Sequence, residues 1–204
     1  MLRAYLYLVK RFARRGYQAI LTNYADVFGL ICMGAGATGF ATGASFRQRR
    51  LCIESLIDEG GGKVFPHYYS HRLIGELRTE EDLTAIVEHR LLQRVRDESP
   101  VAQPLLEILD RGGSAADLQA WAEGQNNLTA AVQHFIWRMN AEAQRLLAEP
   151  LPARRRDMVR GWLEDADANA LYIKNRLKKA APKGERVAPA GTWLRLYDEI
   201  VMTL

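Results

Sequence analysis

The first part of the chain alternates between apolar segments of helical and of extended character. In Leu2–Arg15 the apolar residues recur at helical spacing, and Gly16 follows where a helix commonly ends. Two short apolar runs, Tyr17–Asn23 and Thr38–Thr42, have the length and the polar or glycine boundaries of buried strands. Between them, Ala25–Met33 predicts a second helix. Helices and short strands in alternation are typical of parallel α/β architecture.

A third helix, Phe46–Ile57, is predicted after Ser45, and a glycine cluster at Gly60–Gly62 closes this part of the chain. From Thr79 onward the pattern is helical, with Asp82 three residues after a threonine N-cap. The predicted helical segments are Thr79–Arg96, Leu105–Leu109, Ser114–Trp121, Asn127–Leu147, Ala153–Lys179 and Trp193–Met202. We therefore expect an α/β portion over residues 1–62, with two short parallel strands, a linker over 63–78 and a mainly α-helical domain over 79–204.

The glycine-rich run Gly34–Gly43 allows three interpretations. In the first, its glycines flank the strand Thr38–Thr42. In the second, Gly34, Gly36 and Gly39 form the G-x-G-x-x-G fingerprint of dinucleotide binding, although that motif follows a strand and the residues before this one predict a helix. In the third, the uncharged segment Val27–Ser45 spans a membrane, although it is rich in glycine. The first interpretation fits the surrounding pattern best.

With this arrangement, the N-terminal portion resembles the last two units of a (β/α)8 barrel, at the level of the fold and of no particular family. The resemblance implies an anion site in the loops after the two strands, because such loops and helix N-termini often bind phosphate. The corresponding residues are Thr22 and Asn23 after the first strand, and Gly43, Ala44, Ser45 and Arg47 after the second. Two strands form only an incomplete barrel with open edges, so a partner chain, an oligomer or further βα units would complete the sheet.

The distribution of charge also favours an anionic ligand. Residues 1–50 contain eight basic residues and one acid, Asp26, which gives 8 − 1 = +7, whereas the whole chain carries only +4. The leading hypothesis is therefore that the protein binds an anionic or phosphorylated small molecule. The alternative is a non-enzymatic module that binds nucleic acid or another partner through the basic N-terminal quarter and the arginine cluster at Arg154–Arg160.

Other chemistry finds little support in the sequence. His67 and His71 stand four residues apart, as metal ligands on a helix would, but no third ligand lies at a set spacing, so no metal is expected. Cys32 and Cys52 lie in apolar segments and indicate free thiols in a reducing, cytoplasmic compartment. We expect no cofactor and no membrane span, and we identify no catalytic residues.

Overall fold

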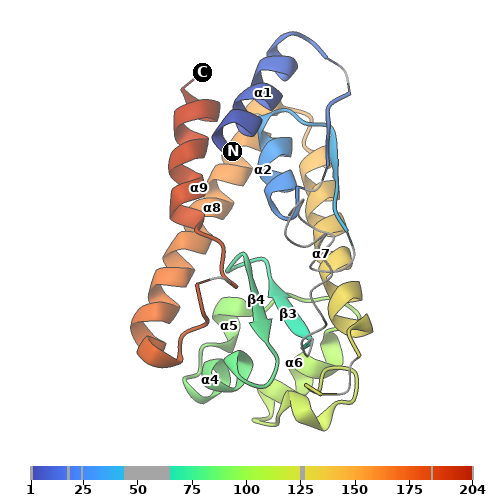
Figure 1. Ribbon diagram of the computed structural model, residues 1–204, viewed down its shortest axis with the longest axis vertical. Coiled ribbons are helices and arrows are strands. Elements are labelled where there is room, and N and C mark those ends of the chain that lie inside the picture. The colour runs from blue at the N-terminus through green and yellow to red at the C-terminus, as the bar shows by residue number, and fades with distance from the viewer. Residues whose placement is uncertain are drawn as a thin grey trace, which may run out of the picture. The chain divides into compact units, whose positions relative to one another are not determined.

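The computed structural model describes residues 2–17, 19–23, 25–43, 65–124, 127–184 and 186–203, and the chain forms two compact units (Figure 1). The first unit comprises Met1–Asp58, Met139–Glu164 and Ala190–Leu204. The second comprises Glu59–Arg138 and Asp165–Pro189. Two long helices, α7 (Thr129–Ala148) and α8 (Pro152–Leu177), contribute residues to both units.

The first unit begins with the helices and strands that the sequence pattern predicts. Helix α1 (Leu2–Arg14) precedes strand β1 (Leu21–Asn23), and helix α2 (Phe28–Ala35) connects β1 to strand β2 (Gly39–Ala41). The two strands pair in parallel, as predicted. They form a two-stranded sheet, and the described residues close no barrel. The mixed α/β character of this portion is thus confirmed. The predicted helix Phe46–Ile57 and the cluster Gly60–Gly62 lie outside the described residues.

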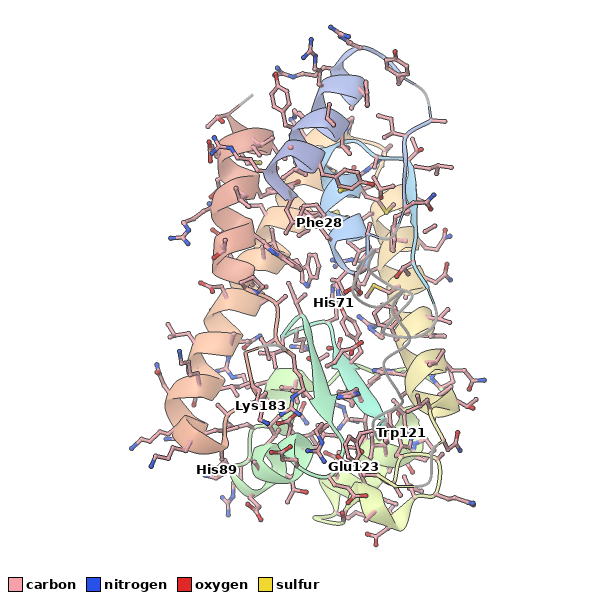
Figure 2. The ribbon with its side chains drawn as sticks, viewed as in Figure 1. Phe28, His71, His89, Trp121, Glu123 and Lys183 are labelled. Carbon is pink, nitrogen blue, oxygen red and sulfur yellow. The ribbon has the colours of Figure 1, made fainter. Side chains whose placement is uncertain are left out.

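Helix α2 is buried along its whole length, because nearly all of its residues are apolar. It packs its Phe28 ring edge-to-face against Trp193 on α9 (Ala190–Tyr197), with ring centroids 5.7 Å apart (Figure 2). The helix ends at Gly36, whose φ of 116° is accessible to glycine and costly for other residues. Gly36 donates its N–H to the carbonyl of Met33, and Ala37 donates to that of Cys32, which forms a Schellman cap.

This geometry decides between the interpretations of the glycine-rich run. The motif from Gly34 to Gly39 follows a helix and precedes a strand, which is the reverse of the order that dinucleotide binding needs. Residues 27–43 divide into a short helix, a turn and a strand, so they form no continuous span. Among the described helices, none has both the length and the apolarity required to cross a bilayer.

The second unit contains a β-hairpin where the sequence pattern predicted only a linker. Strands β3 (His67–Ser70) and β4 (Gly75–Arg78) pair antiparallel, with His67 opposite Arg78 and Ser70 opposite Gly75. Helices α4 (Asp82–Glu88), α5 (Leu92–Val95) and α6 (Gln103–Asp110) follow the hairpin. Their apolar faces share one core with the hairpin, and its largest members include Tyr68, Leu77, Leu83, Leu105 and Trp121.

The predicted helix Thr79–Arg96 is wrong in its extent, because the chain turns between α4 and α5. Arg90 adopts a left-handed φ of 58°, and the N–H groups of Arg90 and Leu91 bond to the carbonyls of Val87 and Ile86. This is a Schellman cap with arginine in the position that usually holds glycine. Thr79 does not cap the helix either, since its hydroxyl donates to the carbonyl of Trp121, 2.8 Å away.

The remaining predicted helices are present with small changes at their ends, except Ser114–Trp121. Helices α6, α7 and α8 lie where the apolar periodicity placed them, and α9 continues into η4 (Asp198–Met202). The segment that begins at Ser114 is only a single 3-10 turn, η2 (Ala115–Asp117), closed by a capping box between Ser114 and Asp117. A second 3-10 turn, η3 (Lys178–Ala180), follows α8. The chain is therefore mainly helical after the hairpin, as expected.

Candidate anion site at the ends of two parallel strands

The carboxyl ends of β1 and β2 lie side by side in the first unit. Thr22 pairs with Phe40 and Asn23 with Ala41, and the ladder continues as Ala25 donates its N–H to the carbonyl of Ala41 at 3.5 Å. Because the strands are parallel, the residues that follow each of them reach the same edge of the sheet. Thr22 and Asn23 therefore lie beside the end of β2, and Gly43 follows that end by two residues. Ala44, Ser45 and Arg47, the other three predicted positions, lie outside the described residues.

Thr22 and Asn23 face opposite sides of β1. The side chain of Thr22 is buried, with 1% of the residue exposed, whereas Leu21 and Asn23 on either side of it are exposed. Successive residues of a strand alternate between its two faces, so Thr22 and its partner Phe40 share one face. That face is the one covered by α2, because Phe40 lies directly against the Cα of Gly29. The side chains of Thr22 and Asn23 thus cannot point into the same space.

Two threonine hydroxyls of this region are buried and have no hydrogen-bond partner among the described residues. They are Thr22 Oγ1, within β1, and Thr42 Oγ1, directly after β2. A third threonine, Thr38, shows the contrast at the opposite end of the strands: its hydroxyl accepts from the N–H of Ile20 at 2.9 Å and lies 3.1 Å from the carbonyl of the same residue. A buried hydroxyl without a partner costs about 1–3 kcal/mol. Thr22 and Thr42 therefore keep two donors available at a cost to stability.

Asp26 follows the end of β1 and begins the turn into α2. It is buried, with 8% of the residue exposed, and adopts a left-handed φ of 47°, which aspartate tolerates better than most residues. Its carbonyl accepts the N–H of Gly29 at 3.1 Å. It is also the one acid of the basic N-terminal quarter. A ligand at this edge would thus meet hydroxyl donors and a nearby carboxylate, and the charge of that carboxylate opposes a bound anion.

The second unit holds a buried polar network that the sequence analysis did not anticipate. The Tyr68 hydroxyl lies 2.6 Å from the carbonyl oxygen of Asp97. The Asp97 carboxylate accepts from the Ser70 hydroxyl at 3.2 Å and from the N–H of Arg72 at 3.0 Å, and Arg138 lies 3.3 Å from its other oxygen. Burial raises the pKa of Asp97 to about 6, while the charge of Arg138 and the hydrogen bonds act in the opposite direction.

His134 is the second centre of this network and is fully buried. Its Nε2 lies 2.8 Å from the carbonyl of Tyr69, which can only accept, so Nε2 carries the proton and Nδ1 accepts from the Ser99 hydroxyl at 2.7 Å. Burial lowers the pKa of His134 to about 4. A serine donating to a neutral histidine is the pairing of nucleophilic hydrolases. Here Ser99 is only 4% exposed and its oxygen also accepts from the N–H of Ala102, so the pair stabilises the core.

The two histidines of the sequence His67–His71 do not share a helix face, because His67 lies on β3 and His71 in the turn after it. The described residues contain no group of three or more histidine, cysteine or acidic side chains able to hold a metal ion. Cys32, on α2, is a buried free thiol, and burial raises its pKa to about 12. Cys52 lies outside the described residues.

Comparison with known proteins adds no relative: no protein-family model, no curated protein and no solved structure matches the chain.

Proposed function

We propose that the protein binds a small anionic molecule, such as a phosphorylated metabolite, at the carboxyl end of the β1–β2 sheet. The observation that carries the proposal is the pair of buried hydroxyls, Thr22 and Thr42, which have no partner in the part of the chain that is described. In a parallel α/β unit this edge is where ligands bind, because loops and helix N-termini supply further N–H donors there. Arg47 would supply the positive charge, a role taken from the sequence analysis alone.

We also propose that the parallel β1–β2 unit corresponds to the end of a (β/α)8 barrel. Parallel sheets are normally covered on both faces, yet Leu21 is 76% exposed on the face of β1 opposite α2. We propose that a second polypeptide covers this face and extends the sheet. A second copy of the chain is the simplest such partner: sedimentation should then show self-association that Leu21→Glu abolishes, and a monomeric wild type would contradict a second copy.

The anion site is tested by titrating inorganic phosphate into the protein by calorimetry. We expect Thr22→Val and Arg47→Ala each to weaken binding roughly fivefold or more, since the first removes a buried hydroxyl donor and the second removes a positive charge. Valine matches the shape of threonine, so the variant leaves the packing unchanged. Thr84→Val is the matched control, because Thr84 is exposed on α4 in the other unit. Equal affinity in wild type, Thr22→Val and Arg47→Ala would contradict the site.

The buried thiol of Cys32 supports the expected cytoplasmic location, because such thiols are typical of reducing compartments. Oxidative stress on the purified protein should leave this thiol unmodified, since the thiolate is the reactive form and burial disfavours it.

A further inference from the structure

The exposed face of α1 combines arginines with aromatic side chains. Segment Leu2–Arg15 contains no acid. Its apolar stripe, which includes Leu6 and Val9, is buried in the first unit. The residues that remain exposed follow one another along the opposite face at helical spacing. They include Arg3, Tyr7, Leu8, Arg11, Phe12, Arg14 and Arg15.

The end of α1 holds an additional aromatic ring against this face. Gly16, with a φ of 78°, donates to the carbonyl of Ala13, and Tyr17 donates to that of Phe12. These two bonds form a Schellman cap, which brings the residue after the glycine back onto the last turn of the helix. The Phe12 and Tyr17 rings accordingly meet edge-to-face with centroids 5.2 Å apart. Both remain open to solvent, with Tyr17 58% exposed.

Helix α8 contributes further positive charge from the same unit. Two hydrogen bonds one helical turn apart connect α1 and α8 to the C-terminal helix: Lys10 Nζ donates to the carbonyl of Val201 at 3.1 Å, and the Tyr197 hydroxyl donates to that of Arg156 at 3.2 Å. The pKa of Lys10 is lowered by burial and then by the charges of Arg156 and Arg14, so these cations lie close together.

Among the residues that the structure describes, much of this charge has no acidic partner. Arg3 pairs with Glu199, and Arg160 pairs with Glu164 and Asp198. Over the described part of the chain, Arg11, Arg14, Arg15 and Arg154 take part in no ion pair. We define the basic aromatic surface as Arg11, Phe12, Arg14, Arg15, Tyr17 and Arg156. A cluster of positive charges attracts a polyanion. This attraction is stronger for a partner with many negative charges than for one with few.

We propose that the basic aromatic surface binds single-stranded nucleic acid. Guanidinium groups pair with backbone phosphates, and exposed rings provide platforms on which bases stack. A membrane surface fits less well. A helix that lies on a bilayer separates an apolar face from a charged one, whereas the apolar stripe of α1 is already used in the core and its exposed face mixes arginines with rings. The proposal is independent of the anion site, because it uses none of the residues of that site.

The test is fluorescence anisotropy of labelled oligouridine and oligothymidine, titrated with the full chain at increasing salt. We expect binding at low salt that weakens with log[salt] at a slope of about −0.7 per phosphate contact. The double variant Arg11→Gln, Arg14→Gln should weaken binding roughly tenfold and reduce the steepness of the slope. Tyr17→Ser should weaken it by a similar factor with the slope unchanged, since stacking releases no counterions.

The matched control is Lys178→Gln, Lys179→Gln, which removes the same charge from exposed residues of the second unit. Affinity in this control should stay within about twofold of wild type, as expected of charges outside the contact. Three results would overturn the proposal: no anisotropy change at low salt, an equal loss in the control, or binding to phosphatidylserine vesicles with none to the oligonucleotides. Phosphate affinity measured on the Arg11, Arg14 variant should remain that of wild type, which separates this surface from the anion site.

Discussion

The His134 imidazole stacks on the Tyr68 ring, with centroids 4.7 Å and planes 14° apart. In the neutral ring Nε2 donates to the carbonyl of Tyr69 and Nδ1 accepts from the Ser99 hydroxyl. Burial lowers the pKa of His134 to about 4 from an ordinary value near 6.5, with a smaller contribution from the charge of Arg138, while the hydrogen bond to Tyr69 acts in the opposite direction. The unfolded chain then takes up a proton on this histidine between pH 6.5 and pH 4, while the folded chain does not. His134 alone should make the protein less stable as the pH falls through this range.

Asp97 acts in the opposite direction. Its pKa is about 6 in the folded protein, raised by burial, and near 4 when unfolded. Between these values the folded state holds more protons, so acid favours folding and stability is lost as the pH rises through 6. The two groups partly compensate in the wild type. We expect Asp97→Asn to unmask a loss of stability on the order of 3 kcal/mol from pH 6.5 to 4. Urea unfolding measured at several pH values in that range gives the change in the free energy of unfolding with pH.

The reverse variant checks the assignment. In His134→Gln the histidine contribution is gone, so the free energy of unfolding should rise, or fall less than in wild type, as the pH drops from 6 to 4. Both variants will have lower absolute stability, because each leaves a buried partner without its hydrogen bond. The dependence on pH is the decisive quantity. If the free energy of unfolding changed with pH equally in both variants and in the wild type, Asp97 and His134 would not be the groups that titrate.

Thr22→Val should make the protein more stable while it weakens the proposed anion binding. The Thr22 hydroxyl is buried with no partner in the described ranges of the chain, and valine replaces it with a methyl group of the same shape. Removing an unsatisfied hydroxyl should raise the free energy of unfolding by about 1 kcal/mol in the absence of ligand. Thr38→Val is the contrasting variant, because it breaks the two contacts with Ile20 and should lower stability by about 1–2 kcal/mol. Equal changes in both would argue against an orphan hydroxyl at Thr22.

Arg90→Gly should stabilise the second unit. Arg90 occupies the left-handed cap position after α4 with a φ of 58°, and its side chain is exposed. A left-handed conformation costs a residue with a Cβ roughly 1–2 kcal/mol, and the greater freedom of glycine in the unfolded chain recovers part of the difference. We expect a net gain of about 0.5–1 kcal/mol by thermal or urea unfolding. Arg90→Ala should give no such gain, because alanine keeps the Cβ.

Local signals account for the parts of the fold that the sequence predicted. Helix α1 ends before Gly16, the glycine that marked its end in the sequence, and this glycine takes the positive φ that a helix cap favours. Helix α2 continues two residues beyond the predicted end at Met33 and is capped by Gly36. The β3–β4 hairpin was missed for a physical reason: Tyr68, Tyr69 and Ser70 are all buried, so β3 shows no alternation between apolar and polar residues. Its turn also ends at Ile74 with a φ of 49°, a residue that rarely signals a turn.

The residues at the carboxyl ends of the two strands were predictable from the sequence, whereas the surroundings of their side chains were not. Parallel strands bring their carboxyl ends together, which located Thr22, Asn23 and Gly43. Thr42 was not singled out, because nothing in the sequence separates it from Thr38. Whether a buried hydroxyl finds a partner depends on the register of the two strands, and this register pairs Thr38 with Ile20 and gives Thr42 no bond to any residue that the structure describes. The network around His134 could not be predicted either, because it joins residues from three separate segments. These are strand β3, the loop that precedes α6, and helix α7.

Gly34, in the glycine-rich run, lies where helices pack too closely for a side chain. A matched pair of alanine variants can test this close packing. A Cβ at Gly34 would lie 2.4 Å from the Tyr197 hydroxyl and 2.8 Å from Val159, so α2 approaches α8 and α9 too closely for any side chain. Gly34→Ala should lower the free energy of unfolding by about 1–3 kcal/mol and displace the Tyr197 hydroxyl from the carbonyl of Arg156. Gly161, within α8, has nothing within 4 Å of its Cβ position. Gly161→Ala should therefore raise stability by about 0.5–1 kcal/mol through helix propensity alone. Opposite signs for these two substitutions, measured by urea unfolding of the same first unit, are expected only if the close approach at Gly34 is correct.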